Sequence, residues 1–441
     1  MQSDKEEDIH MNVAERYRSK CMSTEEALAL LRSGDEVVSS FGAGEACAVL
    51  NELHTIADRI GSLAIWMSMT IPDYPFLSTQ EYLEIFEVNV WFGGPATRKA
   101  QKIGPVSFQP CHLHSLIHRK YQSSVPRVYM GRCTQPDKHG YVKTSMSVIY
   151  EPLAINKAEV VIMEANPNLP EVWGDTAVHI DRVTAFVESD LPAQEIHIAP
   201  VSEKDRAIGR LVSSLVDDGD TVQLGIGSIP NAVAQEFTEK RRLGIHTEMI
   251  TSSMADLVEA GVIDGSRKTL YPGKMVGTFI LGDQKLYDFV DNNPAVLLLR
   301  GEHVNNPWVV AQNDNMVSIN TGMQVDLTGQ VSSESVGYRM YSGTGGQNDT
   351  AEGAIHAKNG RSIIALYSTA KNDAVSTITP SLYPGAGVSL SRNNIDFIVT
   401  EHGVAPLRGL TIRRRIENLI RVAHPKFREE LAFEAKKNRI M

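Results

Sequence analysis

Residues 218–235 read DGDTVQLGIGSIPNAVAQ, and this stretch decides the fold that we expect. A Gly-Asp turn comes first, followed by a short apolar strand, a glycine loop and the start of a helix. Residues 33–50, SGDEVVSSFGAGEACAVL, repeat this order. The matching pairs keep one constant spacing: Gly34 with Gly219, Asp35 with Asp220, Val37 with Val222, and Gly42 with Gly227. We therefore predict a duplicated unit at the start of each half. The alternative is chance, since Gly-Asp turns often precede strands.

The rest of the chain alternates short apolar runs with amphipathic stretches, which is typical of α/β folds. Strands are predicted over Glu36–Ser39, Val128–Met130, Val160–Glu164, Thr221–Leu224, Ala295–Leu299, Ile363–Tyr367 and Phe397–Thr400. Helices are predicted over Ser23–Arg32, Ser202–Val216, Asn231–Lys240 and Ile412–Val422. Proline and alanine around Leu191–Pro200 indicate a linker. The prediction is two related α/β domains packed in tandem, residues 1–195 and 196–441, with the active site at their interface.

The composition narrows the class of protein. Of the 441 residues, 42% are hydrophobic and 22% are charged, as in globular domains with sizeable cores. A formal net charge of -10 argues against binding to nucleic acid or anionic membranes, which both attract a positive face. Met1–His10 is acidic and polar, unlike a signal peptide, and no apolar run is long enough to span a bilayer. The four scattered cysteines fit reduced thiols, so a cytoplasmic location is expected.

The loop after the predicted strand Thr221–Leu224 is the sharpest local feature. Gly225 and Gly227 allow a tight turn and the close approach of a ligand. Pro230 suits the first turn of a helix, whose free N–H groups attract anionic or oxygen-rich ligands. An ordinary strand-to-helix connection has the same composition. A dinucleotide fingerprint is a third interpretation, with Glu248 as its distal acid, but Pro230 stands where that motif needs its third glycine.

Three other clusters carry weaker signals. The stretch SGTGGQ at 342–347 offers backbone N–H groups that suit a thioester carbonyl as it becomes an oxyanion, or it forms a surface loop. His114 and His118 share a helical face near Cys111 and His112, but ligands at metal-binding spacing are lacking, so no metal site is predicted. A basic series is expected to be a solvated helix face, with a phosphate-binding edge as the alternative: Arg413, Arg414, Arg415, Arg421, Lys426 and Arg428.

Ordered motifs from about Met22 to Ala435 together resemble the acetyl-CoA hydrolase/transferase family, and within it the 4-hydroxybutyrate and butyrate CoA-transferase branch. In the first half the matching stretches are Gln135–Tyr141 and Asn166–Pro170. In the second half they are Gly225–Pro230, His246–Met249, Asp326–Val331, Gly345–Gln347, Ser368–Lys371, Thr400–Ala405 and Ala423–Arg428.

The resemblance implies a class I CoA-transferase that moves coenzyme A from an acyl-CoA to a short-chain carboxylate through a glutamyl-CoA thioester. It implies Glu248 as the nucleophile. The implied CoA and substrate site consists of Gly225, Ile226, Gly227, Ser228, Ile229, Gly345, Gly346, Gln347 and Lys371. No cofactor is expected beyond the CoA thioesters that serve as substrates. A homo-oligomer, as a homodimer, is also expected.

Several alternatives stay open at this point. The acid could be 4-hydroxybutyrate, butyrate or acetate, or a dicarboxylate such as itaconate or succinate. The function could instead be that of an acyl-CoA hydrolase, or of a CoA- or dinucleotide-binding module without turnover. One departure from the family pattern bears on the acid: Thr350 replaces a phenylalanine and Glu352 a basic residue. We expect Asn348–Glu352 to be a loop that borders the acyl pocket and sets acyl preference.

Glu248 lies in the apolar stretch LGIHTEMITS at 243–252, where a buried and unpaired charge is costly. Partial burial would strip water from a carboxylate nucleophile and protect an anhydride intermediate from hydrolysis. The alternative is a structural acid at a strand end. Glu401 and Glu334 are expected to have supporting roles only.

Overall fold

The computed structural model describes residues 11–197 and 199–441. The prediction that Met1–His10 is no signal peptide lies outside the described residues. Contacts divide the chain into two compact units. The first contains the chain up to Cys111, then Ser115–Glu195 and Phe279–Arg300, and the second contains His112–His114, Ile196–Thr278 and Gly301–Met441. Among the described residues, no helix has the length and apolar character needed to cross a membrane.

The chain passes to the second unit after Glu195, but residues 279–300 return to the first unit. There the Ile280 N–H donates to the Met146 carbonyl at 2.9 Å. The Asp291 carboxylate accepts the Glu171 N–H at 2.7 Å. These contacts join residues more than a hundred positions apart in the sequence. A single boundary after residue 195 therefore does not separate the two units.

The first unit is built on a seven-stranded parallel sheet in the order β10-β7-β5-β1-β2-β3-β4. Its strands are β1 (Asp35–Ser39), β2 (Leu63–Ser68), β3 (Phe86–Phe92), β4 (Val106–Phe108), β5 (Val128–Cys133), β7 (Val160–Ala165) and β10 (Ala185–Glu188). Its helices include α2 (Val13–Lys20), α3 (Thr24–Ala29), α4 (Cys47–Asn51), α5 (Ala57–Ile60), α6 (Gln80–Ile85), α7 (Pro95–Ala100), α8 (Leu116–Ser123), α9 (Glu151–Lys157) and α13 (Gln284–Val290).

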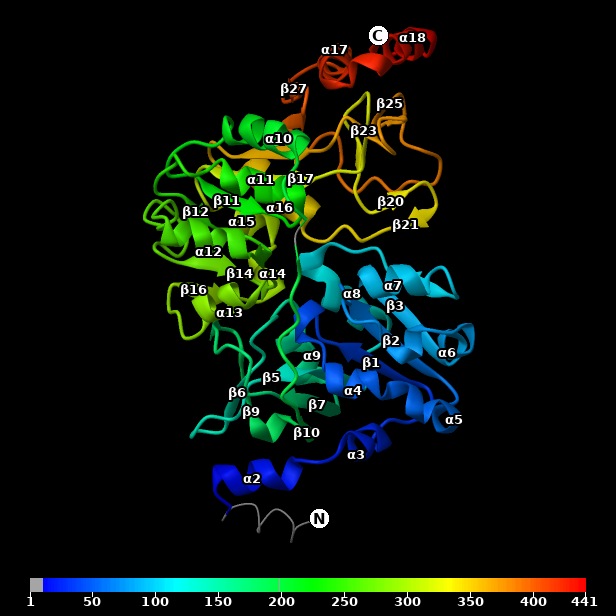
Figure 1. The fold of residues 1–441 in the computed structure, drawn as a ribbon, viewed down its shortest axis with the longest axis vertical. Coiled ribbons are helices and arrows are strands. Elements are labelled where there is room, and N and C mark those ends of the chain that lie inside the picture. Colours follow the sequence, from blue (N-terminus) through cyan, green and yellow to red (C-terminus); the bar gives the residue numbers. More distant parts are fainter. Residues whose placement is uncertain (1–10, 198) are drawn as a thin grey trace. The chain divides into compact units, whose positions relative to one another are not determined.

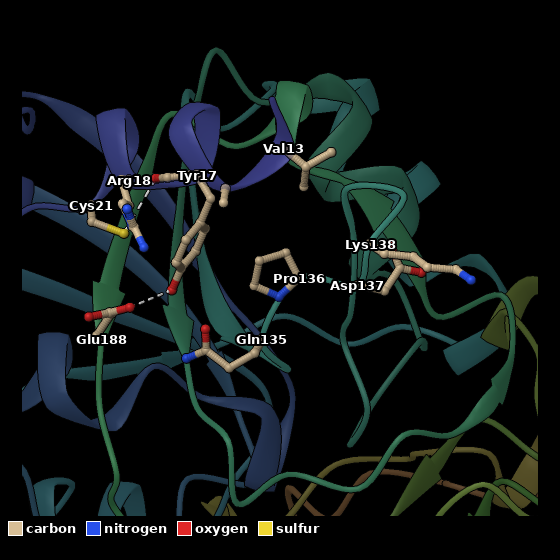
Figure 2. A pocket seen from close by; sticks show the side chains of 10 residues that line it. Val13, Tyr17, Arg18, Cys21, Gln135, Pro136, Asp137, Lys138 and Glu188 are labelled. Atoms are coloured by element: carbon tan, nitrogen blue, oxygen red, sulfur yellow. Dashed lines mark hydrogen bonds between the residues drawn. The ribbon is translucent and has the colours of Figure 1, made fainter. Parts of the chain in front are cut away.

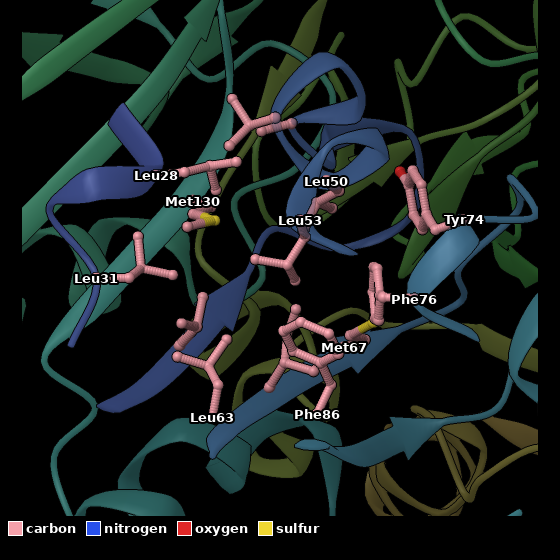
Figure 3. Packing of buried hydrophobic residues seen from close by; sticks show 14 of the residues in the cluster. Leu28, Leu31, Leu50, Leu53, Leu63, Met67, Tyr74, Phe76, Phe86 and Met130 are labelled. Atoms are coloured by element: carbon pink, nitrogen blue, oxygen red, sulfur yellow. The ribbon is translucent and has the colours of Figure 1, made fainter. Parts of the chain in front are cut away.

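One apolar core lies between this sheet and the helices on it. Leu50, Met67 and Phe86 come from α4, β2 and β3 and point into the same interior (Figure 3). Each of the three is fully buried. Burial of side chains of this size stabilises the fold by about 1.5–3 kcal/mol each, which is the main force that holds helix and sheet together.

The second unit contains a six-stranded sheet in the order β12-β11-β17-β22-β26-β27, parallel except for the last pair. Its strands are β11 (Thr221–Leu224), β12 (Gly244–Ile245), β17 (Met316–Thr321), β22 (Arg361–Ala365), β26 (Phe397–Thr400) and β27 (Gly403–Pro406). Its helices include α10 (Glu203–Ser213), α11 (Ser228–Gln235), α12 (Ser252–Glu259), α14 (Gly301–Val304), α15 (Pro307–Val310), α16 (Gln347–His356), α17 (Ile412–Val422) and α18 (Arg428–Lys437). Figure 1 shows α10 beside α11, and both α11 and α16 pack against β17.

The predicted duplication is confirmed by the place of β1 and β11 in their sheets. Each pairs on one side with the next strand of its sheet, β2 or β12, and on the other side with a later strand, β5 or β17. The turns also agree, since Gly34 and Gly219 have φ of 79° and 82°. Their N–H groups donate to the residues 62 and 241, just before the second strand of each sheet, at 2.9 and 3.0 Å. Left-handed backbone of this kind favours glycine.

Candidate active site

The carboxyl edge of the second sheet carries two of the features that the sequence singled out, the glycine loop and Glu248. The strand order reverses at β11, because β12 follows it on one side and β17 on the other. Gly225 follows β11, and Glu248 lies at a bend shortly after β12. In open α/β sheets, ligands bind at the carboxyl ends of the strands where the order reverses.

The glycine loop after β11 has the geometry of a ligand-binding turn. Gly227 has φ of 123° and ψ of 179°, which only glycine adopts readily. Helix α11 begins directly at Ser228, earlier than the predicted start at Asn231, because Pro230 fits the first turn. The residues 225–228 are partly exposed. Within the described part of the chain, the N–H groups of residues 226–229 have no acceptor, so they are available to a ligand.

Glu248 is partly exposed and is held by two donors. The Asn305 amide nitrogen lies 3.1 Å from Glu248 Oε2, and the backbone N–H of Gly346 also bonds the carboxylate. Gly346 caps the start of α16. A Cβ at Gly346 would lie 2.0 Å from Glu248 Oε2 and 2.1 Å from the Asn305 amide nitrogen. A side chain at position 346 would therefore displace the ends of Glu248 and Asn305.

The environment of Glu248 disfavours its charge. Burial raises its pKa to about 7, the Asp349 charge adds to this rise, and the bonds from Asn305 and Gly346 oppose it. Asp349 is fully buried and accepts the N–H and Nδ1 of His114 at 3.0 and 2.9 Å. A carboxylate poorly solvated by water and poised near neutral pH fits a nucleophile better than a structural acid.

The structure brings only some of the predicted site residues together. Gly346 contacts Glu248, and the Gln347 amide donates to the Thr321 carbonyl at 2.8 Å at the end of β17. Thr247 donates to the Leu224 carbonyl at 3.4 Å, which joins the Glu248 segment to the glycine loop. Gly345 has φ of 53° and lets the chain enter α16.

Lys371 stands apart from this group. It lies on the exposed turn between β23 (Thr369–Ala370) and β24 (Val375–Ser376). Residues 371–373 all have positive φ, of 52°, 55° and 62°. No described contact joins Lys371 to Glu248.

The predicted loop over Asn348–Glu352 is wrong, because these residues belong to α16. Thr350 is buried and donates to the Gly346 carbonyl at 3.0 Å; its hydroxyl also lies 3.0 Å from Ser318 Oγ. It therefore anchors the first turn of α16. The sequence reading missed this because Gly-Gly-Gln and the polar run after it are typical of a loop.

The supporting carboxylates have structural contacts. Glu401 accepts the N–H and hydroxyl of Ser368 at 2.9 and 2.7 Å. Glu334 accepts the hydroxyls of Thr344 and Ser389 at 2.8 and 2.7 Å and so fixes the loop that leads to Gly346.

Three residues around Glu248 were missed: Asn305, which bonds it, Asp349, whose charge raises its pKa, and His114, which bonds Asp349. The pair His112 and His114 drew notice only as metal ligands, and the described residues contain no group of three side chains that could hold a metal. The separation of Asn305, Asp349 and His114 from Glu248 along the chain gives no signal of these contacts.

A separate pocket of about 570 Å³ lies in the first unit (Figure 2). Tyr17 donates to Glu188 at 3.0 Å on one side of it, and Gln135 and Pro136 lie nearby. Asp137 is engaged in a turn, where it accepts the N–H groups of residues 139 and 141 at 2.8 and 2.9 Å. The Gln135–Tyr141 motif therefore has a structural use here.

Comparison with known proteins identifies two family domains in the chain. The acetyl-CoA hydrolase/transferase N-terminal domain matches residues 2–201, and the C-terminal domain of that family matches residues 282–435. The 4-hydroxybutyrate coenzyme A transferase of Clostridium kluyveri is 42% identical, over 97% of this chain and 100% of that one. The succinyl-CoA:cyclohexane-1-carboxylate CoA transferase of Geobacter metallireducens is 40% identical, over 96% and 97%. The crystal structure of RipA from Yersinia pestis has a TM-score of 0.92 at 32% identity, covering 98% of this chain and 100% of that chain.

Proposed function

The chain belongs to the acetyl-CoA hydrolase/transferase family, and we propose that it moves coenzyme A from an acyl-CoA to a short-chain carboxylate through a thioester on Glu248. One observation carries the proposal. Glu248 is a partly exposed carboxylate with a pKa raised to about 7, and Asn305 and Gly346 hold it at the reversal point of the sheet.

In the first half-reaction, a Glu248 oxygen attacks the acyl-CoA carbonyl. The C–S bond breaks, which leaves a mixed anhydride and the CoA thiolate. The thiolate then attacks the glutamyl carbonyl, the first acid departs as its carboxylate, and a glutamyl-CoA thioester remains. In the second half-reaction, the incoming carboxylate attacks this thioester and the same two steps run in reverse. No cofactor takes part.

The donors around Glu248 suit this chemistry. When its carbonyl carbon becomes tetrahedral, negative charge gathers on an oxygen that the Asn305 amide and the Gly346 N–H can reach. The free N–H groups of the glycine loop would hold CoA between the two half-reactions, so the thiolate returns as an intramolecular nucleophile.

The acceptor that we propose is a four-carbon acid such as 4-hydroxybutyrate or butyrate, because the relative from Clostridium kluyveri carries the first in its name. A dicarboxylate such as succinate is the second candidate, since the relative from Geobacter metallireducens is named for succinyl-CoA.

An exchange assay tests the proposal. Acyl-CoA mixed with a labelled carboxylate should give labelled acyl-CoA, with parallel lines in a double-reciprocal plot that report a ping-pong sequence. Without an acceptor, borohydride should trap the thioester and peptide mapping should place the label on Glu248. Release of free CoA without exchange would instead identify a hydrolase, and label on another residue would contradict the role of Glu248.

A further inference from the structure

A hydrogen-bonded relay of three side chains supports the glycine loop. Ser228 Oγ lies 2.9 Å from the Tyr367 hydroxyl, and this hydroxyl donates to Asp205 Oδ1 at 2.5 Å. Asp205 sits in the first turn of α10 and is only 2% exposed, whereas Tyr367 follows β22 and is partly exposed. The proposed transfer steps do not involve these three side chains.

The direction of each hydrogen bond in the relay is fixed by Asp205. Its Oδ2 accepts the N–H and hydroxyl of Ser202 at 2.8 and 2.5 Å. Burial acts to raise the pKa of Asp205, but hydrogen bonds from Ser202, Tyr367 and Ser228 outweigh it and lower the pKa overall. The group is therefore ionised and can only accept. Tyr367 has one hydroxyl hydrogen and gives it to Asp205, so Ser228 must donate within the relay.

This direction decides what Ser228 can offer to a ligand. Its only hydrogen is used within the relay, so at this partly exposed residue at the start of α11 the oxygen has only lone pairs left for a ligand. At the neighbouring Gly227, a Cβ would meet only Pro230, at 3.8 Å, so the approach is open. A ligand atom that meets Ser228 Oγ must be a hydrogen-bond donor. Phosphate and thioester oxygens do not qualify at neutral pH, whereas an amide N–H does.

We propose that Ser228 accepts an amide N–H from the thiol-bearing arm of coenzyme A, and that Asp205 and Tyr367 are positioning residues that keep Ser228 an acceptor. The inference rests on the proposed function, because it takes CoA as the ligand of the glycine loop. The arm carries two amide N–H groups and one hydroxyl. The other donors of CoA, the adenine amino group and the ribose hydroxyl, lie at the far end of the molecule from the thiol.

The test compares CoA with two analogues in which one or the other amide N–H is replaced by an ester oxygen. Binding to the full chain is measured by isothermal titration calorimetry. The wild-type protein should bind one analogue about tenfold or more weakly than CoA. The ester oxygen of that analogue would face Ser228 Oγ, and neither oxygen would have a hydrogen to donate to the other. Ser228→Ala removes that acceptor, so the ratio of the two dissociation constants should approach one.

Asp205→Asn is the sharper variant, since it keeps the shape and reverses the relay. The position of Oδ2 receives a backbone N–H from Ser202 and must stay an oxygen, so the new amide nitrogen takes the place of Oδ1. It then donates to Tyr367, Tyr367 donates to Ser228, and the Ser228 hydrogen turns toward the ligand. The preference for the N–H ligand should vanish or invert.

Ser214→Ala is the matched control. It removes an exposed hydroxyl at the end of α10, which donates to the Leu211 carbonyl, and should keep the wild-type ratio. Equal binding of CoA and both analogues by the wild-type protein would overturn the inference, as would a wild-type ratio in Ser228→Ala. Should Asp205→Asn fail to fold, Ser228→Ala decides alone. Failure of the wild-type protein to bind CoA would count against the proposed function.

Discussion

The loops after β1 and β11 share one turn and one place in their sheets, yet one is closed and the other is open. In the first unit, residues 38–47 are buried, and the Glu151 carboxylate accepts the Ser40 hydroxyl and the Phe41 N–H, each at 2.9 Å. In the second unit, residues 225–228 are partly exposed, and no described acceptor meets the N–H groups that follow Gly225. A carboxylate of the protein fills the first loop. The two loops share the same turn, so the turn does not decide whether a ligand can bind. What decides it is whether a side chain of the protein already bonds the N–H groups of the loop.

The largest effect is expected from Glu248, the partly exposed carboxylate beside the open loop of the second unit. Glu248→Ala should lower the rate of label exchange by a factor on the order of 10⁴ or more, since no other group carries CoA between the half-reactions. Glu248→Asp withdraws the carboxylate by one methylene and should lose about a hundredfold. The matched change in the first unit is Glu45→Gln, which alters a buried carboxyl held by Thr70 and Tyr74 at 2.7 and 3.1 Å. Its exchange rate should stay close to wild type. Near-normal exchange by Glu248→Ala would remove the catalytic distinction between the units.

Removal of the Glu151 carboxylate from the loop after β1 should lower the stability of the protein and not its exchange activity. Glu151→Ala leaves the Ser40 hydroxyl and the N–H groups of Phe41 and Tyr150 buried without their acceptor. The free energy of unfolding should fall by about 3–5 kcal/mol, measured by urea denaturation. Glu151→Gln keeps one acceptor oxygen and should lose less. A loss below about 1 kcal/mol for the alanine variant would mean that water replaces the carboxylate and that the first loop is not closed by it.

Two glycine substitutions compare the crowding in the two units. Gly346→Ala places a Cβ against Glu248 and Asn305, so the exchange rate should fall about a hundredfold through displacement of the nucleophile. At Gly42 in the first loop, φ is 54° and no atom lies within 4 Å of a Cβ. Gly42→Ala should therefore cost about 1 kcal/mol in unfolding free energy and leave exchange intact. Equal exchange rates in the two variants would contradict the assignment of Gly346 to the active site.

The smallest effect concerns pH. The pKa of Glu248 is raised by burial and by Asp349 to about 7, so the folded protein holds this proton more tightly than the unfolded chain does. The carboxyl therefore has little effect on stability below its unfolded pKa, and it destabilises the fold as the pH rises through about 7. Glu248→Gln should raise the free energy of unfolding by roughly 1–3 kcal/mol at pH 8 and hardly at all at pH 4. A gain that is the same at both pH values would show that the titration of Glu248 is not its source.

Much of the scaffold could be predicted from local patterns. The bounds of β11, β26 and α17 agree with the sequence prediction to the residue. Their apolar periodicity and flanking turn residues act within a few positions, which a sequence shows directly. The shared Gly-Asp turn was visible for the same reason. The strand predicted over Ile363–Tyr367 is instead Arg361–Ala365, because pairing with β17 sets its register.

The chemical surroundings of Glu248 were less accessible to prediction. His114 meets Asp349 across 235 positions of the chain, and Asn305 meets Glu248 across 57. Contacts of this span depend on how the sheet and helices pack, and no local periodicity encodes them. Asn348–Glu352 was misread because its polar sequence reflects burial against Ser318 and His114, not exposure in a loop.

The return of residues 279–300 to the first unit has a consequence for synthesis on the ribosome. The first unit cannot form all of its contacts when residue 195 emerges, since Ile280 and Asp291 still have to arrive to bond Met146 and Glu171. At 5–20 residues per second, the roughly 100 intervening residues keep it incomplete for about 5–20 s. The glycine loop and the Glu248 segment of the second unit are both made during that interval. The N-terminal half of the nascent chain therefore waits for a segment encoded late, and a ribosome stalled before residue 279 would present a first unit that has all seven strands of its sheet but lacks the contacts of residues 279–300.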